Sequence, residues 1–126
     1  AKTAVEELLR YDSPVQLTTR WVFEDVPFGD VTFKKGQQVA TVFGAANRDP
    51  ERFETPNQLD IRREDNKHLA FGNGIHYCLG APLARLEGQI AFEELAKRLP
   101  TLQFNGDPVR RNTYVLRGFS SLPLTW

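Results

Sequence analysis

A loop with two glycines leads to the only cysteine of the chain, and a helix follows directly. The loop reads Phe71-Gly72-Asn73-Gly74-Ile75-His76-Tyr77-Cys78-Leu79-Gly80. Pro82 comes next, at a position that the first turn of a helix tolerates. Apolar residues then recur every three or four positions, at Leu79, Leu83, Leu86, Ile90, Ala91, Leu95 and Leu99. This spacing predicts a helix with one apolar face that begins near Pro82 and ends near Pro100.

The position of Cys78 before this helix favours an ionised sulfur. Backbone N–H groups of the first turn lie near the thiol, and the helix dipole adds partial positive charge there. Gly72, Gly74 and Gly80 leave space for a large, flat group beside the sulfur. The alternative is a small buried cysteine without chemistry. The context favours a site that holds a thiolate next to an open planar space.

Three kinds of chemistry fit a lone cysteine in this context to different degrees. One cysteine and two histidines supply fewer soft ligands than zinc sites usually need, so zinc is disfavoured. A Cys78–His76 nucleophile remains open, although no third group that would orient the histidine is evident. A haem-thiolate needs only one cysteine from the protein and is favoured over both.

Periodicity elsewhere predicts an α+β chain with short elements. Residues 1–11 form an amphipathic helix that Asp12-Ser13-Pro14 ends. β-prone runs at residues 17–23, 31–33 and 39–43, with turns at Pro27, Gly29-Asp30 and Lys35-Gly36, predict hairpins.

Two further stretches lack a clear period. Residues 47–67 are predicted to be an irregular connection held by side-chain hydrogen bonds, with Phe53, Leu59 and Ile61 buried. The tail, residues 113–126, is predicted to form one last hairpin.

Composition restricts the class of protein. The 126 residues suit one domain that buries roughly two-thirds of its unfolded surface. Sixteen basic residues balance sixteen acidic ones, which argues against nucleic acid or an anionic membrane surface as the main partner. No apolar run approaches ~20 residues, and no signal-peptide pattern is present. The chain has no Met, and its first helix has no capping residue before it, so we expect a truncated N-terminus.

The loop resembles the haem-binding loop of the cytochrome P450 family. It has the Phe, both glycines, the His two positions before the Cys and the Gly two positions after it. Glu7 and Arg10 match the family's Glu-x-x-Arg helix motif, although such a pair alone is usually a weak, solvated ion pair. The segment Asn47-Arg48-Asp49-Pro50, with Phe53, resembles the start of the meander in soluble bacterial members. The resemblance spans essentially residues 1–126, roughly the last third of a family chain.

The resemblance implies a fold and a role for each matching residue. The chain is expected to be an α+β part of the mainly-α cytochrome P450 fold, with haem b (iron-protoporphyrin IX) bound. Cys78 is the expected axial ligand, Arg20 and His76 contact the haem propionates, and Phe71 packs beside the thiolate, with Gly72, Gly74 and Gly80 shaping the loop. The expected structural ion pair is Glu7–Arg10. Candidates for the substrate pocket are Val15, Gln16, Leu17, Thr18, Val115 and Leu116.

Other roles have simpler alternatives. Arg20 could be a solvated strand residue, and His76 could brace the loop. Arg85 matches a position that often faces the electron-donor protein, but a basic helix residue is more often simply solvated. His68 is interpreted as plain surface or loop structure. Gln58 lies where the family often has an arginine that completes the Glu-x-x-Arg ion network, and its amide can bond only as a neutral group.

The resemblance implies a cytoplasmic monooxygenase that inserts one atom of dioxygen into a small hydrophobic substrate. Electrons would come from a ferredoxin-type or flavoprotein partner. The family's oxygen-activating helix lies upstream of this region, so we expect no turnover from the chain alone and expect exposed apolar faces that promote aggregation. A non-catalytic haem-binding remnant and, more weakly, a cysteine hydrolase remain as alternatives.

Overall fold

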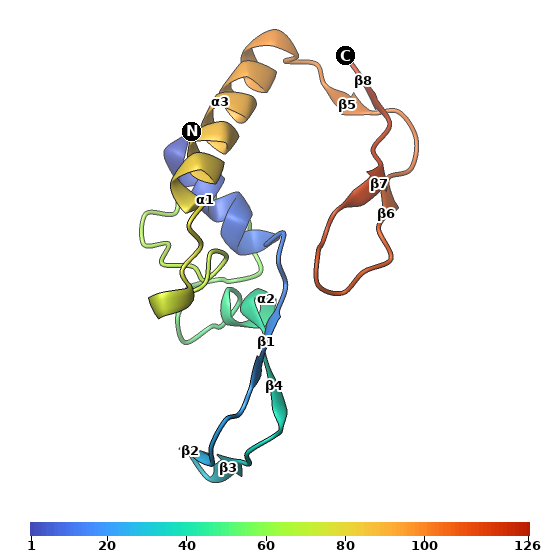
Figure 1. Ribbon diagram of the computed structural model, residues 1–126. Helices are drawn as coiled ribbons and strands as arrows, with labels where there is room; N and C mark the ends of the chain where they lie inside the picture. Colours follow the sequence, from blue (N-terminus) through green and yellow to red (C-terminus); the bar gives the residue numbers. More distant parts are fainter.

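The computed structural model describes residues 1–126 and has the mixed α+β character that the sequence predicts. Figure 1 shows an open arrangement: two helices lie together, a hairpin arm extends from one end, and the C-terminal strands stand apart from the helices. The elements in chain order are α1 (Lys2–Tyr11), β1 (Thr18–Trp21), β2 (Val26–Phe28), β3 (Val31–Phe33), β4 (Gln38–Thr41), α2 (Phe43–Ala46), the 3-10 turn η1 (Gly74–His76), α3 (Ala81–Arg98), β5 (Gln103–Phe104), β6 (Val109–Arg110), β7 (Phe119–Ser121) and β8 (Leu124–Thr125).

The two longer helices pack against each other at a glycine. A Cβ atom built on Gly88 of α3 would lie 3.2 Å from Cγ1 of Val5, a buried residue of α1. Glycine at this position therefore permits the close approach of the helices. Both helices agree with their predicted ranges to within two residues.

Two antiparallel ladders build the hairpin arm. Strand β1 pairs with β4, with Arg20 opposite Val39, and β2 pairs with β3 farther out along the arm (Figure 1). The predicted hairpins are confirmed, but two details are wrong. Pro27 lies within β2 and not in a turn, because β2 is an edge strand that tolerates proline. Phe43 begins α2 and does not end a strand.

The C-terminal strands do not form the hairpin predicted within residues 113–126. Strand β7 pairs with β6, and β8 pairs with β5, so both partners lie upstream of that segment. Leu116 instead makes an isolated antiparallel bridge with Val15. The β-prone residues were identified correctly, but strand propensity does not specify the partner of a strand.

The connection from residue 47 to residue 67 is irregular and held by side-chain hydrogen bonds, as predicted. Phe53 is buried in it, whereas Leu59 and Ile61 are exposed, so the prediction of burial is wrong for those two residues. The reason is that this stretch wraps around a cluster of polar side chains, described below, and not around an apolar core.

The core is small, and its largest buried side chains are polar. Nine of the 126 residues are buried, and the largest fully buried side chains are Arg10, Glu7, Asn47 and Ser13. The accessible surface is 9638 Å², against about 6,800 Å² for a compact protein of this mass. The prediction of two-thirds burial is therefore wrong for this chain. Leu83, Leu86 and Ile90 on α3 are each more than half exposed, as expected. None of the helices has the length and apolar character needed to cross a bilayer.

Candidate functional site

Arg10 is fully buried, and each of its five N–H donors has a partner. Nε and Nη2 donate to the two carboxylate oxygens of Glu7, both at 2.8 Å. Nη1 donates to the backbone carbonyls of Asn47 and Pro56, both at 2.8 Å, and Nη2 also reaches the carbonyl of Gln58 at 3.1 Å. The Glu-x-x-Arg pair is therefore a buried connection between α1 and the meander, and not a solvated ion pair.

Glu7 is the acceptor for this cluster. Besides Arg10, it accepts bonds from the backbone N–H of Asp60, Nε of Arg63 and Nδ2 of Asn66, at 2.9 to 3.1 Å. Burial alone would raise the pKa of Glu7, but the bonds from Arg10 and Asp60 and the charges of Arg10 and Arg63 outweigh it, so the pKa lies below its usual value. The carboxylate is held ionised inside the protein.

Arg63 supplies the second guanidinium of the network, which sequence reasoning missed. The sequence suggested instead that the side-chain amide of Gln58 replaces the arginine that the family often has at that position. In the structure Gln58 takes part only through its backbone carbonyl. Arg63 lies three residues after the end of segment 56–60. Its guanidinium also donates to the carbonyl of Glu54 at 2.9 Å. No local signal in the sequence marks Arg63, because its partner Glu7 lies 56 positions away.

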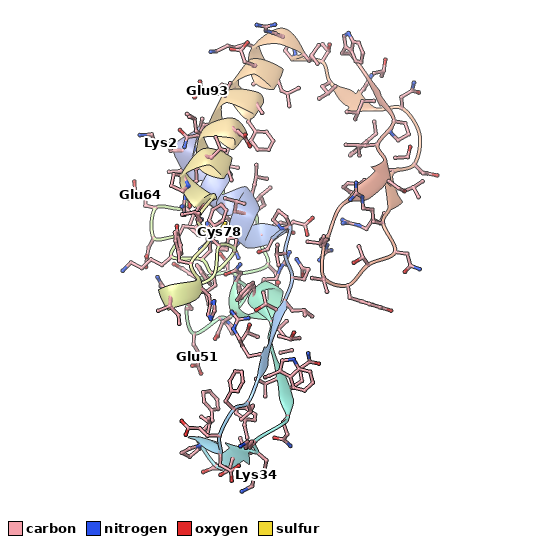
Figure 2. All side chains as sticks on the ribbon, viewed as in Figure 1. Lys2, Lys34, Glu51, Glu64, Cys78 and Glu93 are labelled. Atoms are coloured by element: carbon pink, nitrogen blue, oxygen red, sulfur yellow. The ribbon has the colours of Figure 1, made fainter.

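The Cys78 loop is closed by its own backbone. The N–H of Cys78 donates to the carbonyl of Phe71 at 2.9 Å, and the N–H of Tyr77 donates to the carbonyl of Gly74 at 3.1 Å. Gly72 and Gly74 have φ of +73° and +64°, a left-handed conformation that favours glycine. Cys78 is left exposed at the end of this turn, directly before α3 (Figure 2).

Cys78 opens onto a pocket of about 630 Å³ that three separate segments line. The loop contributes Phe71, Gly72, His76 and Cys78, and β1 contributes Thr18 and Arg20. Two further groups are mainly apolar: Leu9 of α1 with Pro14 and Val15 after it, and Val42, Phe43, Ala46, Leu69 and Ala70 around α2 and the loop. The structure thus brings together residues that lie up to 69 positions apart in the sequence.

The two basic side chains predicted to face a haem share this pocket with Cys78. Arg20 is exposed, and its Nη1 donates to Oγ1 of Thr18 at 3.0 Å and to the carbonyl of Thr19 at 2.8 Å. The ring of His76 makes no hydrogen bond that would brace the loop. The thiol of Cys78, the guanidinium of Arg20 and the imidazole of His76 therefore line one mainly apolar space, which points to a ligand site.

Some predicted residues lie outside the pocket lining. These are Gln16, Leu17, Gly74, Gly80, Val115 and Leu116. The backbone N–H of Gln16 donates to the carbonyl of Val115 at 2.9 Å, and the N–H of Gly44 donates to the carbonyl of Gln16, so this segment borders the pocket through its backbone. Gly80 is near the thiol, since a Cβ atom on it would lie 3.8 Å from Sγ of Cys78.

The donor set of the pocket fits a haem. A single thiolate is an incomplete ligand set for zinc, whereas it is the whole protein contribution in a haem-thiolate. The pocket has a volume of about 630 Å³ and a mainly apolar lining, which suits the body of a large, flat group. Arg20 and His76 suit the carboxylates that such a group carries.

His68 is part of a buried network, which corrects its interpretation as plain surface or loop structure. Its side chain is 1% exposed. Its Nδ1 accepts the N–H of Ala70 at 3.1 Å, so Nε2 carries the proton and donates to Glu6 at 3.0 Å. Burial lowers the pKa of His68 more than the Glu6 carboxylate raises it. Glu6 also binds Arg85; burial would raise the pKa of Glu6, but Arg85 and His68 bring it below its usual value.

We expect these groups to make the protein sensitive to acid. A pKa lowered in the folded state contributes stability that is present above the unfolded value and is lost as the pH falls. For His68 the loss begins below about pH 6.5, and for Glu6 and Glu7 below about pH 4.5. Urea unfolding of the intact protein that carries this chain, from pH 8 to 4, measures this. His68→Gln should remove the upper step only, and a stability that rises between pH 7 and 5 would contradict the prediction.

Comparisons with known proteins identify relatives of this chain in one family. The family model described as Cytochrome P450 matches residues 1–112. The polyketide biosynthesis cytochrome P450 PksS of Bacillus subtilis is 50% identical, over 98% of this chain and 31% of its own length. The biotin biosynthesis cytochrome P450 of the same organism is 48% identical, over 98% and 32%. The crystal structure of P450BioI in complex with acyl carrier protein ligated to hexadec-9Z-enoic acid superposes with a TM-score of 0.95, at 47% identity, over 99% of this chain and 33% of that one. The chain thus spans about a third of the length of these relatives.

Proposed function

This chain belongs to the cytochrome P450 family, and we propose that it is the haem-ligating, C-terminal part of a bacterial-type monooxygenase. The proposed whole protein inserts one atom of dioxygen into a small hydrophobic substrate and reduces the other atom to water. One observation carries the proposal: Cys78, Arg20 and His76, from two separate segments, line the same mainly apolar pocket.

Each residue of the pocket has a proposed task toward the haem. Cys78 binds the iron as a thiolate, and bound haem supplies oxygen activation, which electron donation from a thiolate favours. Arg20 and His76 hold the propionates by charge-assisted hydrogen bonds. Phe71 and the apolar lining keep water away from the sulfur, which preserves the strength of these interactions.

The substrate class and partners are proposed from the lining and from the relatives. The part of the lining that Val15 and Val42 form is apolar, which suits a hydrophobic organic molecule beside the haem. Relatives are named for polyketide and biotin biosynthesis, and P450BioI was solved with an acyl carrier protein, so acyl chains, free or carrier-bound, are the first class to test. A ferredoxin-type or flavoprotein donor is proposed as the source of electrons, and a cytoplasmic location stays a prediction.

Isotope labelling tests the reaction directly. The intact protein that carries this chain is loaded with haem, supplied with a ferredoxin, its reductase and a fatty acyl substrate, and exposed to ¹⁸O₂. The proposal predicts a product with one ¹⁸O atom and the second atom in water. Haem binding without incorporation across the substrate series favours the non-catalytic remnant. A trapped thioester at Cys78 without haem binding would favour the hydrolase.

Arg20→Ala is expected to weaken haem retention. Losing a hydrogen bond to a charged group costs about 1.5–3 kcal/mol, so haem should leave the intact protein about tenfold faster or more. Transfer of haem to an excess of apomyoglobin measures the rate, and His76→Ala should have a smaller effect in the same direction. Lys35→Ala is the matched control, because Lys35 is a basic residue on the same hairpin arm outside the pocket lining. Equal rates for Arg20→Ala and Lys35→Ala would refute the propionate role.

A further inference from the structure

Arg85 of α3 contacts both arms of the Cys78 loop. Its guanidinium carbon lies 4.6 Å from the centroid of the Phe71 ring, and Nη1 donates a 2.7 Å hydrogen bond to the hydroxyl of Tyr77. Phe71 is the residue whose carbonyl accepts the N–H of Cys78, and Tyr77 directly precedes Cys78. One side chain therefore touches the beginning and the end of the segment that presents the thiol.

Arg85 is itself held by α1. Nε and Nη2 donate to the two oxygens of Glu6 at 2.7 and 3.0 Å, which is a two-point contact with fixed geometry. Glu6 is also held by His68, whose ring centroid lies 6.0 Å from that of Phe71. Because α1 and α3 pack closely at Gly88, the guanidinium is anchored by two helices as well as contacting the loop.

The positive charge of Arg85 is already paired with the Glu6 carboxylate inside the chain. Hydrogen bonds to Glu6 and then to Tyr77 raise the pKa of Arg85 against the effect of burial, so it stays protonated and paired. Its side chain is 30% exposed. A paired guanidinium attracts an acidic partner more weakly than a free one does, so this geometry favours a role toward the loop over the electron-donor contact that the resemblance implies.

We propose that Arg85 is the positioning residue for Cys78: it fixes Phe71 and Tyr77 relative to each other and thereby directs the thiolate toward the iron. This inference rests on the proposed haem-thiolate function. Groups behind a metal ligand orient it and tune the metal, and their loss typically costs 10–100-fold in affinity or activity. Arg85 is not among the residues that line the ligand pocket, so it would act on Cys78 through the loop.

The first test needs no haem. Amide hydrogen exchange is measured in the intact apo-protein for wild type, Arg85→Ala and Arg98→Ala. Arg98 lies on the same helix and has a similar bond, from its Nε to Glu94 at 2.7 Å, but it does not touch the loop. We expect the Cys78 N–H to exchange at least about tenfold faster in Arg85→Ala, while amides in the middle of α3 stay unchanged. Arg98→Ala should match wild type at every loop amide.

The second test uses the haem-loaded protein. In the reduced, CO-bound state, Arg85→Ala should lose the red-shifted thiolate band in a larger fraction of molecules than wild type. Tyr77→Phe removes one hydrogen bond and keeps the ring, so it should fall between the two. Arg85→Lys should restore part of the band, because it keeps the charge but not the two-point geometry.

The outcomes separate this inference from the proposed function. If wild type shows no thiolate band, the proposed function fails, and the exchange of the Cys78 amide still reports on the loop independently. Loop exchange and band fraction in Arg85→Ala equal to those in Arg98→Ala would overturn the positioning role. So would a uniform increase in exchange over α1, α3 and the loop, which indicates only general loss of stability. Weaker donor binding with an unchanged loop and band would overturn it in favour of partner docking.

Discussion

Arg10→Ala should destabilise the protein by about 3–5 kcal/mol, a large part of the roughly 5–15 kcal/mol that stabilises a typical domain. The substitution leaves the Glu7 carboxylate buried with less compensation, and it leaves the carbonyls of Asn47, Pro56 and Gln58 without a donor. Urea unfolding of the intact protein that carries this chain, or the yield of folded protein, measures the loss. Arg10→Lys should recover little, because an ammonium group has three donors and no fork to match Glu7.

An exposed ion pair of the same length provides the control. Nζ of Lys34 lies 2.8 Å from Asp25 at the far end of the hairpin arm, the same distance as in the Arg10–Glu7 pair (Figure 2). Exposed pairs contribute little, so Lys34→Ala should leave the unfolding midpoint almost unchanged. If Arg10→Ala and Lys34→Ala shift the midpoint equally, the Arg10 cluster does not hold α1 to the meander.

Replacing Cys78 by serine should abolish oxygen insertion while the fold survives. The side chain is exposed in this chain, and the backbone bond from its N–H to Phe71 does not depend on the sulfur. A hydroxyl is a poor substitute for a thiolate, so product formation should fall by more than about 100-fold, the upper end of what altering a group behind a ligand costs. Product yield per haem and the urea unfolding midpoint are measured together.

Product yield and unfolding midpoint together exclude loss of folding as the cause of lost turnover. A normal unfolding midpoint with lost turnover assigns the effect to the ligand. Turnover within a few-fold of wild type in Cys78→Ser would contradict the role of Cys78, since no other cysteine is present to replace it.

Local signals predicted the parts of the fold that local physics decides. The three-to-four spacing of apolar residues gave the ranges of α1 and α3. The family resemblance predicts that Cys78, His76, Phe71 and Arg20 share one site, and in the structure all four line one pocket. Family membership followed from the same motif.

Partners distant in sequence were not predictable in this way. Nothing near Arg63 indicates that it binds Glu7, 56 positions away, and nothing near His68 indicates Glu6. The same limit explains the C-terminal strands, since β8 pairs with β5 across some twenty residues. The apolar character of Leu59 and Ile61 predicted burial, but both are exposed. The segment that carries them surrounds the buried ion cluster of Glu7 and Arg10.

The absorption spectrum of the haem-loaded intact protein, reduced and exposed to carbon monoxide, tests the central claim most directly. The account predicts a strongly red-shifted Soret band, the sign of sulfur bound to iron opposite the carbon monoxide, and its disappearance in Cys78→Ser. A band at the position typical of a nitrogen ligand in fully folded wild-type protein, or no uptake of haem at all, would contradict it.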